Sequence, residues 1–206
     1  PAALWRPRPR PRGGPQGSRR ARGLTRSCYA VRVEAGLGTE ANVERIYEMA
    51  RAGEDVNQRS FNGYTPLAVA SAAGAEQVVA MLLERRAEVA PATAHRGELP
   101  LHHAARGGHR VVCQLLAPLA KAAGVIDAPN ITGWPPVHLA AVGGFANVIT
   151  VLLRNHAEPD CANAVLGRGT AVHVAARMGA ADTVEALVDR GASEDPPDAT
   201  GHSPLH

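Results

Sequence analysis

The 206-residue sequence is poor in aromatic side chains and in cysteine, and it lacks any long hydrophobic run. Because aromatic residues make up only 3% of the chain, a core has to be built from Ala, Val and Leu. Such small side chains suit closely stacked short helices better than a sandwich or barrel. The three cysteines (Cys28, Cys113 and Cys161) are odd in number and widely spaced. This spacing excludes a disulfide framework and a CxxC zinc pair and favours a reduced compartment, so we expect an intracellular protein, cytoplasmic or nuclear. No apolar run approaches the roughly 18 residues that a membrane-spanning helix needs.

Acidic residues are missing from the first 33 positions, which hold nine arginines. The rest of the chain has 22 − 9 = 13 basic and 19 acidic residues, a charge of −6. A nucleic-acid groove needs positive charge on the folded part. We therefore expect no nucleic-acid binding by the body of the protein, and at most a weak, non-specific contact by the leader.

The leader, residues 1–33, alternates Arg with Pro before a stretch of Gly, Gln and Ser. Proline blocks helix formation and like charges repel, so disorder or polyproline II is expected. A solvated leader, or a misplaced gene start, is the preferred interpretation. The alternatives are a proline-motif ligand, a tether to nucleic acid or anionic membrane, and a transit peptide, although repeated proline disfavours the amphipathic helix of the last. Because the chain starts at Pro1 and stops within a motif at His206, we expect a piece of a longer protein.

From residue 65 onward one sequence block recurs. Its copies begin TPLAVASAAG, LPLHHAARGG, PPVHLAAVGG and TAVHVAARMG, and a final SPLH follows. The second residues of these blocks are spaced by 34, 36, 35 and 33 positions: Pro66, Pro100, Pro136, Ala171 and Pro204. Residues 41–57 match the back half of the pattern. A period of this length predicts stacked supersecondary units.

Each block has the features of two short helices. Thr65, Thr170 and Ser203 stand where an N-cap hydroxyl is expected, and proline follows at the first helical position in most blocks. The short Ala-rich helix ends at a glycine that suits a left-handed helix stop: Gly74, Gly108, Gly144 and Gly179. Apolar residues at helical spacing predict a second helix, followed by a turn-rich link. The unit that contains the LPLHHAARGG block carries extra residues at 117–129, which lengthen either its second helix or the following loop.

This pattern resembles the ankyrin repeat, with its TPLHxA motif and 33-residue period. The resemblance places a repeat domain at residues 34–206, with units at about 35–57, 58–91, 92–128, 129–162, 163–197 and, in part, 198–206. It implies an all-α solenoid of helix-turn-helix units with hairpin loops. It also implies a non-catalytic, monomeric scaffold or adaptor that binds a partner protein, with no cofactor and no metal. The alternative is the substrate-recruiting region of a larger enzyme, such as a kinase, ubiquitin ligase or acyltransferase.

Three histidines and a cysteine lie close together in the sequence, at His102, His103, His109 and Cys113, and could be zinc ligands. His102, however, aligns with a histidine in three later blocks, so it recurs once per unit. Successive copies in a helical stack lie about 10 Å apart, too far for one ion. His109 takes the position after the helix-stop glycine, where the family commonly has histidine. Zinc is therefore disfavoured, and His103 is left as a candidate contact residue.

No catalytic constellation emerges from the chain. The stretch GLGTEA at 36–41 superficially resembles a dinucleotide fingerprint, but no second strand follows it. A glycine-rich entry loop into a capping helix is the better interpretation.

The family resemblance implies two sets of functional positions. The first is structural and consists of the motif residues Thr65, Pro66, Leu67, Pro100, Leu101, His102, Pro136, Val137, His138, Thr170, His173, Pro204, Leu205 and His206. The second consists of partner contacts on the hairpin tips and the exposed face of each first helix. Carried over by register, these are Phe61, Asn62, Tyr64, His95, Arg96, Glu98, His103, Arg106, Ile131, Trp134, Val142, Leu166, Arg168, Arg177 and Met178. The aromatic rings have an alternative role, which is to pack over their own hairpins.

Overall fold

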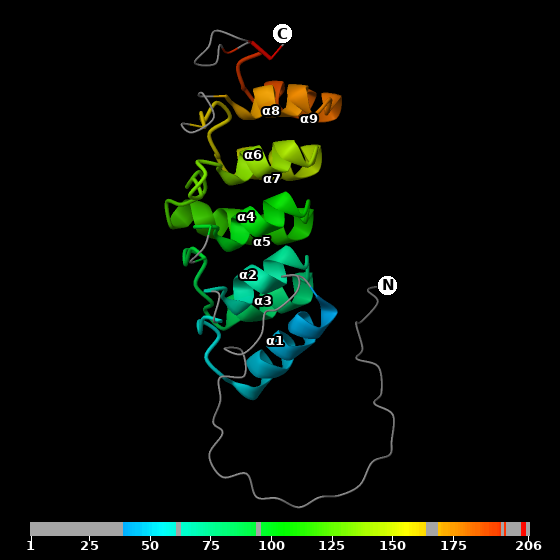
Figure 1. Cartoon of the computed structure of the whole chain (residues 1–206). Helices are drawn as coiled ribbons and strands as arrows, with labels where there is room; N and C mark the ends of the chain where they lie inside the picture. The colour runs from blue at the N-terminus through cyan, green and yellow to red at the C-terminus, as the bar shows by residue number, and fades with distance from the viewer. Residues whose placement is uncertain are drawn as a thin grey trace, which may run out of the picture.

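The described part of the chain is a single stack of helices (Figure 1). This computed structural model describes residues 39–60, 63–93, 96–163, 169–194, 196 and 203–204, in which nine α-helices and no strand are found. The first helix is α1, and four helix pairs follow it. The bounds of the helices are α1 Glu40–Ala52, α2 Pro66–Ala72, α3 Glu76–Glu84, α4 Pro100–Arg106, α5 Arg110–Ala122, α6 Pro136–Val142, α7 Ala146–Arg154, α8 Ala171–Arg177 and α9 Ala181–Val188. The all-α repeat architecture expected from the sequence is confirmed. The basic leader lies outside the described residues.

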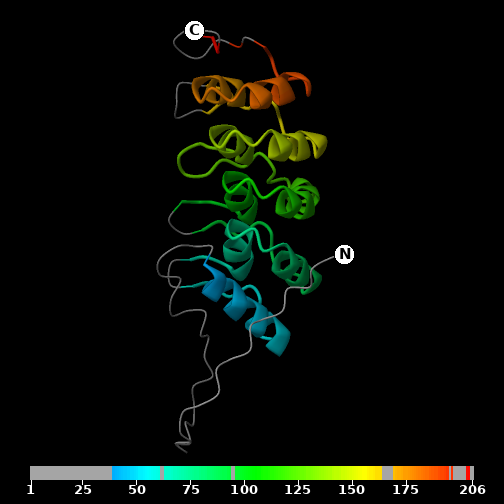
Figure 2. The ribbon, with the colours of Figure 1, turned by 90° about the vertical axis from the view of Figure 1, so that its right-hand side faces the viewer.

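The helices form two columns beside a row of loops (Figure 2). The first helices of the pairs, α2, α4, α6 and α8, contact one another in succession, and so do the second helices, α3, α5, α7 and α9. The first helices lie between the loops and the second helices (Figure 2). Helix α1 lies at the N-terminal end of the stack and contacts both α2 and α3.

The core is a set of ladders in which one residue type recurs from unit to unit. Each rung is at most 2% exposed, and the rungs of the second-helix ladder are Leu82, Leu116, Leu152 and Leu187. An alanine ladder in the first helices is fully buried and comprises Ala70, Ala104, Ala140 and Ala175. Because alanine has no side chain beyond Cβ, neighbouring first helices can approach closely. A chain with few aromatic residues thus builds one continuous core along the stack.

Local sequence sets where the helices begin and end. Pro66, Pro100 and Pro136 are the first residues of their helices, where the missing N–H of proline costs nothing. Beyond each first helix the chain turns at a glycine in the left-handed region, for example Gly108 with φ 71°. A Cβ at Gly108 would lie 2.7 Å from ring carbons of Phe145 in the next unit, so close packing as well as φ favours glycine there.

The extra residues at 117–129 lengthen the second helix of their unit, α5. Helix α5 has 13 residues, whereas α3 and α7 have nine each. Pro118 lies inside α5. Because proline has no N–H, this helix lacks one backbone hydrogen bond.

Acidic and amide side chains at the starts of the loops join successive units. Asn57 Oδ1 accepts a hydrogen bond from the Glu88 N–H at 2.9 Å. Asp127 Oδ1 accepts from the Glu158 N–H at 3.1 Å, and Asp160 Oδ1 accepts from the Ser193 N–H at 3.0 Å. These bonds link the loops that follow α1 and α3, α5 and α7, and α7 and α9.

Candidate functional site

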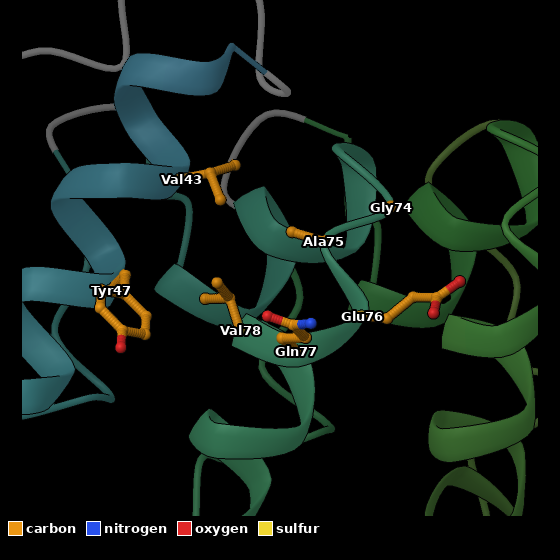
Figure 3. Close-up of a pocket in the computed structure, with 7 residues that line it drawn as sticks. All are labelled: Val43, Tyr47, Gly74, Ala75, Glu76, Gln77 and Val78. Atoms are coloured by element: carbon orange, nitrogen blue, oxygen red, sulfur yellow. The ribbon is translucent and has the colours of Figure 1, made fainter. Parts of the chain in front are cut away.

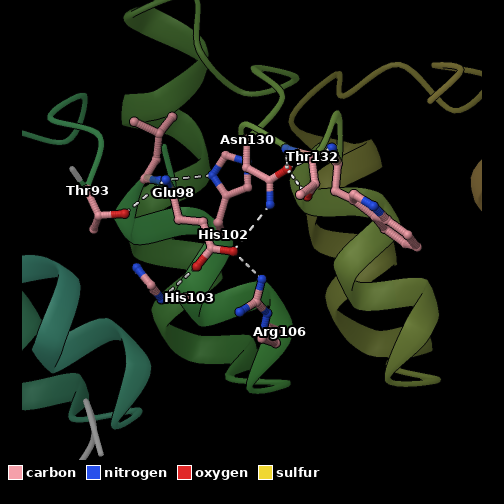
Figure 4. Close-up of polar contacts among 9 residues, drawn as sticks. Thr93, Glu98, His102, His103, Arg106, Asn130 and Thr132 are labelled. Carbon is pink, nitrogen blue, oxygen red and sulfur yellow. Dashed lines mark hydrogen bonds and ion pairs between the residues drawn. The ribbon is translucent and has the colours of Figure 1, made fainter. Parts of the chain in front are cut away.

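A polar cluster surrounds Glu98, the residue two positions before α4 begins (Figure 4). The Arg106 Nη2 donates to Glu98 Oε1 and forms an ion pair with it. The Asn130 Nδ2, from the following hairpin, donates to the same oxygen at 3.2 Å. His103 Nδ1 lies 3.6 Å from Glu98 Oε2. These four residues, Glu98, His103, Arg106 and Asn130, form the Glu98 cluster.

The cluster is buried except on its arginine side. The Glu98 side chain is 1% exposed, whereas that of Arg106 is 41% exposed. The sequence-based interpretation puts Glu98 and His103 on the contact surface, but the structure places both side chains inside. A buried carboxylate needs charged or hydrogen-bonding partners. Glu98 therefore holds the Arg106 guanidinium in place, and Arg106 is the member of the cluster that a partner can reach.

The two neighbouring histidines of α4 are neutral at pH 7. Burial lowers the pKa of His102 to about 4. Burial, and then the charges of Arg106 and Arg96, lower the pKa of His103 to about 4 as well. Burial also raises the pKa of the Cys113 thiol to about 12, so that it is not a thiolate nucleophile or ligand. Across the described ranges, no three His, Cys, Asp or Glu side chains are grouped so as to hold a metal ion.

The motif histidine interacts with backbone groups in each of the three units in which it is described. His102 Nδ1 accepts from the Leu99 N–H at 3.0 Å, and His173 Nδ1 accepts from the Thr170 N–H at 3.1 Å. Each imidazole thus accepts the hydrogen bond of the backbone N–H that precedes its own helix. His138 has no such donor because Pro135 precedes its helix. Its Nε2 lies 3.1 Å from the Gly169 carbonyl oxygen in the next unit.

Sequence reasoning missed a polar residue that starts each hairpin turn. These residues are buried, and they are Ser60, Thr93, Asn130 and Asn163. The Asn130 Oδ1 accepts from the backbone N–H groups of Thr132 at 3.0 Å and Trp134 at 2.9 Å. A recurring small polar residue is a weak signal, because the distance from it to the next helix varies among the units. Asn130 also reaches Glu98, which links the hairpin to the Glu98 cluster.

The exposed predicted residues lie at the ends of the first helices and in two of the hairpins. Arg106, Val142 and Arg177 are the last residues of α4, α6 and α8, and Met178 follows α8. Val142 is 39% exposed and Met178 is 54% exposed. Ile131, which lies in the hairpin before α6, is 67% exposed. Arg96 is also exposed and lies in the hairpin before α4. The first-helix face is defined by Arg106, Val142, Arg177 and Met178.

Of the three predicted aromatic contacts, the two that the structure describes, Tyr64 and Trp134, are half-buried and pack on histidines. The Trp134 ring lies edge-on to His138 of its own unit, with centroids 5.9 Å apart. The Tyr64 ring lies edge-on to His103 of the next unit, at 5.8 Å. Both side chains pack against the core. The geometry thus favours a packing role for the buried part of each ring.

The remaining predicted positions divide between the core and the undescribed segments. Leu67, Leu101 and Val137 are buried at 1–2% exposure. The Thr65 Oγ1 accepts from the Ala68 N–H at 3.2 Å, as an N-cap hydroxyl does. Pro204 is half-buried. Seven predicted residues lie outside the described part, namely Phe61, Asn62, His95, Leu166, Arg168, Leu205 and His206.

A small pocket lies between α1 and the turn that leads into α3 (Figure 3). It has a volume of about 270 Å³ and is lined by Val43, Tyr47 and residues 74–78. Its lining has one carboxylate, Glu76, and therefore no pair of carboxylates for acid–base catalysis. Among the described helices, none is long and apolar enough to cross a membrane.

Helix pairs stacked in register and joined by hairpins define a helical repeat protein. Models of the ankyrin repeat match residues 62–93, 90–163 and 137–206. The chain belongs to the ankyrin repeat family. Ankyrin repeats are non-catalytic protein-interaction domains, so the class of function is protein binding.

The relatives are larger proteins of several kinds. The chain is 29% identical over 192 residues to the E3 ubiquitin-protein ligase XBAT33 of Arabidopsis thaliana, a match that covers 74% of this chain and 37% of the ligase. It is 34% identical over 116 residues to the tyrosine-protein kinase HTK16 of Hydra vulgaris, over 56% of this chain and 15% of the kinase. It is 28% identical over 166 residues to the neurogenic locus notch homolog protein 1 of Xenopus tropicalis, over 74% of this chain and 6% of that protein. The chain therefore spans only a minor part of each of these relatives.

Proposed function

We propose that this chain binds a partner protein through its first-helix face and the adjacent hairpin tips. The observation that carries the proposal is the exposure of Arg106, Val142, Arg177 and Met178 on successive units of one column. Large apolar side chains and arginines are the residue types that contribute most to protein interfaces. Stacked units present such residues as an extended surface.

The proposed partner contacts extend to the predicted loop residues. Ile131 and Arg96 are exposed in two of the hairpins, which supports their inclusion. Phe61, Asn62, His95, Leu166 and Arg168 are included by register alone. Glu98 and His103 contribute by positioning Arg106 rather than by contact, because both are buried.

A second proposal is that the chain recruits substrates for a larger enzyme. Two of its relatives are a ubiquitin ligase and a tyrosine kinase, and the chain spans only part of each. In that arrangement the same face would hold a substrate protein near a catalytic domain elsewhere in the polypeptide. An intracellular location, in the cytoplasm or nucleus, fits the unpaired cysteines Cys113 and Cys161. The unit boundaries, the monomeric state and a weak nucleic-acid contact by the leader stay predictions.

The first-helix face can be tested with a matched pair of variants. Val142 on α6 and Val111 on α5 are both 39% exposed, but they lie in different columns. Affinity capture with the tagged full chain should lose its specific partners with Val142→Asp and keep them with Val111→Asp. Equal capture by both variants would remove the first-helix face from the proposal, provided that circular dichroism shows both to be folded.

A further inference from the structure

The charges of the stack are unevenly divided between its two columns. Helices α2, α4, α6 and α8 contain no Asp or Glu, and the stretches of sequence that precede them, 58–64, 91–98, 129–134 and 161–169, contain one acid, the buried Glu98. The same elements contain five arginines: Arg59, Arg96, Arg106, Arg168 and Arg177. Apart from Glu98, the acids of the four helix pairs lie on the second helices or in the segments that follow them, and two of them, Asp127 and Asp160, accept hydrogen bonds that join successive loops. The column of first helices is therefore basic in a stack whose sequence is acidic overall.

The exposed residues on this column alternate in character from unit to unit. Arg106, Val142 and Arg177 are each the last residue of a first helix, so they occupy the same place in three successive units. Helices α4, α6 and α8 lie one above another (Figure 1) and contact in that order. Packed helices lie about 10 Å apart, so the two arginines flank Val142 at a separation of about 20 Å. Met178 extends the apolar part beside Arg177.

The guanidinium of Arg106 is fixed in a position that is open to solvent. Its Nη2 is bound to the buried Glu98 carboxylate, which in turn is held by Asn130 (Figure 4). The guanidinium has five N–H donors, and its side chain is 41% exposed, so donors remain for a carboxylate from outside. Because its rotamer is already fixed, binding costs less conformational entropy than binding to a mobile arginine.

We propose that the first-helix face recognises an acidic, extended protein segment in which two carboxylate groups flank an apolar side chain. This inference rests on the proposed function and specifies the chemistry of the partner. An extended chain rises about 3.3 Å per residue, so two acids that meet Arg106 and Arg177 stand about six residues apart. The apolar side chain between them lies against Val142. The buried Glu98 counters part of the Arg106 charge, so Arg177 is the stronger site of attraction.

The test uses labelled 12-residue peptides and the full chain. The probe is a Gly/Ser peptide with Glu pairs at its second and third and its ninth and tenth positions, and Leu and Phe at its sixth and seventh. One control replaces Glu by Lys, another replaces Leu and Phe by Ser, and a third is a 12-nucleotide oligothymidine. Binding is measured by fluorescence anisotropy at two salt concentrations. The variant is Arg177→Glu, and its matched control is Arg154→Glu, an exposed arginine that ends the second helix α7.

The acidic apolar peptide should bind at least about fivefold more tightly than the Lys peptide, and more weakly at high salt. Arg177→Glu should weaken binding by about fivefold or more, whereas Arg154→Glu should change it less than twofold. Equal binding of the Glu and Lys peptides would overturn the proposal. So would oligothymidine binding as tight as that of the peptide, which would indicate a general polyanion surface. If the peptide does not bind while Val142→Asp still abolishes partner capture, the face is correct and its proposed ligand chemistry is wrong.

Discussion

The Glu98 cluster makes a quantitative prediction, because its carboxylate is 1% exposed and its arginine is 41% exposed. Substituting Arg106→Met keeps the apolar stem of the side chain and removes its charge. The Glu98 carboxylate then stays buried with only the Asn130 amide donating to Oε1. Breaking a fully buried ion pair costs about 3–5 kcal/mol. We expect a smaller loss of about 2–3 kcal/mol here, because Arg106 is partly solvated and water can reach its side of the cluster.

The second substitution, Glu98→Gln, should be milder. An amide oxygen can still accept from Asn130 and Arg106, and no charge remains buried. We expect a loss of about 1 kcal/mol in the free energy of unfolding. In the Glu98→Gln background, Arg106→Met should cost less than about 1 kcal/mol, which gives a coupling energy of about 1–2 kcal/mol.

The assay is urea unfolding of the full chain, followed by far-UV circular dichroism, for both single variants and the double variant. The order of the single variants is the decisive result. If Glu98→Gln destabilises the protein more than Arg106→Met does, or if the coupling energy is zero, the carboxylate does not depend on Arg106 as described. An exposed matched change, Arg154→Met at the end of α7, should shift stability by less than about 0.5 kcal/mol.

Three further predictions concern protonation, backbone conformation and thiol reactivity. The pKa values of His102 and His103 fall from 6.5 to about 4 on folding, so the unfolded chain binds protons first as the pH drops. The contribution of the two neutral histidines to the free energy of unfolding should be complete above pH 6.5 and decrease toward pH 4, with a loss of about 2 kcal/mol per histidine at pH 5. If urea unfolding at a series of pH values shows the protein becoming more stable over this range, the neutral assignment is wrong. Gly179→Ala should lower the free energy of unfolding by about 1 kcal/mol, which is the strain of its positive φ, because the space around the new Cβ is open. Gly108→Ala adds a clash with the Phe145 ring of the next unit, so it should lower the free energy of unfolding by at least about 1 kcal/mol more. The third prediction concerns a variant in which the other cysteines are replaced by serine. In it, Cys113 should react with a disulfide reagent at pH 8 far more slowly in the native state than in urea, because burial raises the pKa of its thiol to about 12. Equal rates would show that the thiol is exposed.

The repeat architecture could be predicted because each local feature recurs at the same place. Proline at the helix start, glycine beyond the helix end, and the Leu and Ala ladders are visible as a period before any contact is known. The histidine at positions 102, 138 and 173 could be assigned a structural role for the same reason. The length of α5 could not be decided, since residues 117–129 suit either a longer helix or a longer loop.

The candidate site was harder to predict from the sequence, because the exposure of a side chain depends on neighbours from other units. Glu98 occupies the position that holds Tyr64 and Trp134 in other units, two residues before the helix begins. By register it falls among the surface positions. In the structure its carboxylate is buried because two side chains donate hydrogen bonds to it: Arg106, at the end of α4, and Asn130, from the next hairpin, 32 residues away. A register assignment cannot show such a pairing, since it treats each unit separately.

The sequence by itself therefore determined the family, the helices and the ladders that form the core, because these depend on local propensity and on a repeated apolar pattern. Only the tertiary structure decided which polar side chains are inside and which meet solvent. Burial of a charge is stable only when partners from separate segments converge on it. Because of that convergence, Glu98 and His103 are buried and position Arg106. The exposed surface of the first helices is then formed by Arg106, Val142, Arg177 and Met178.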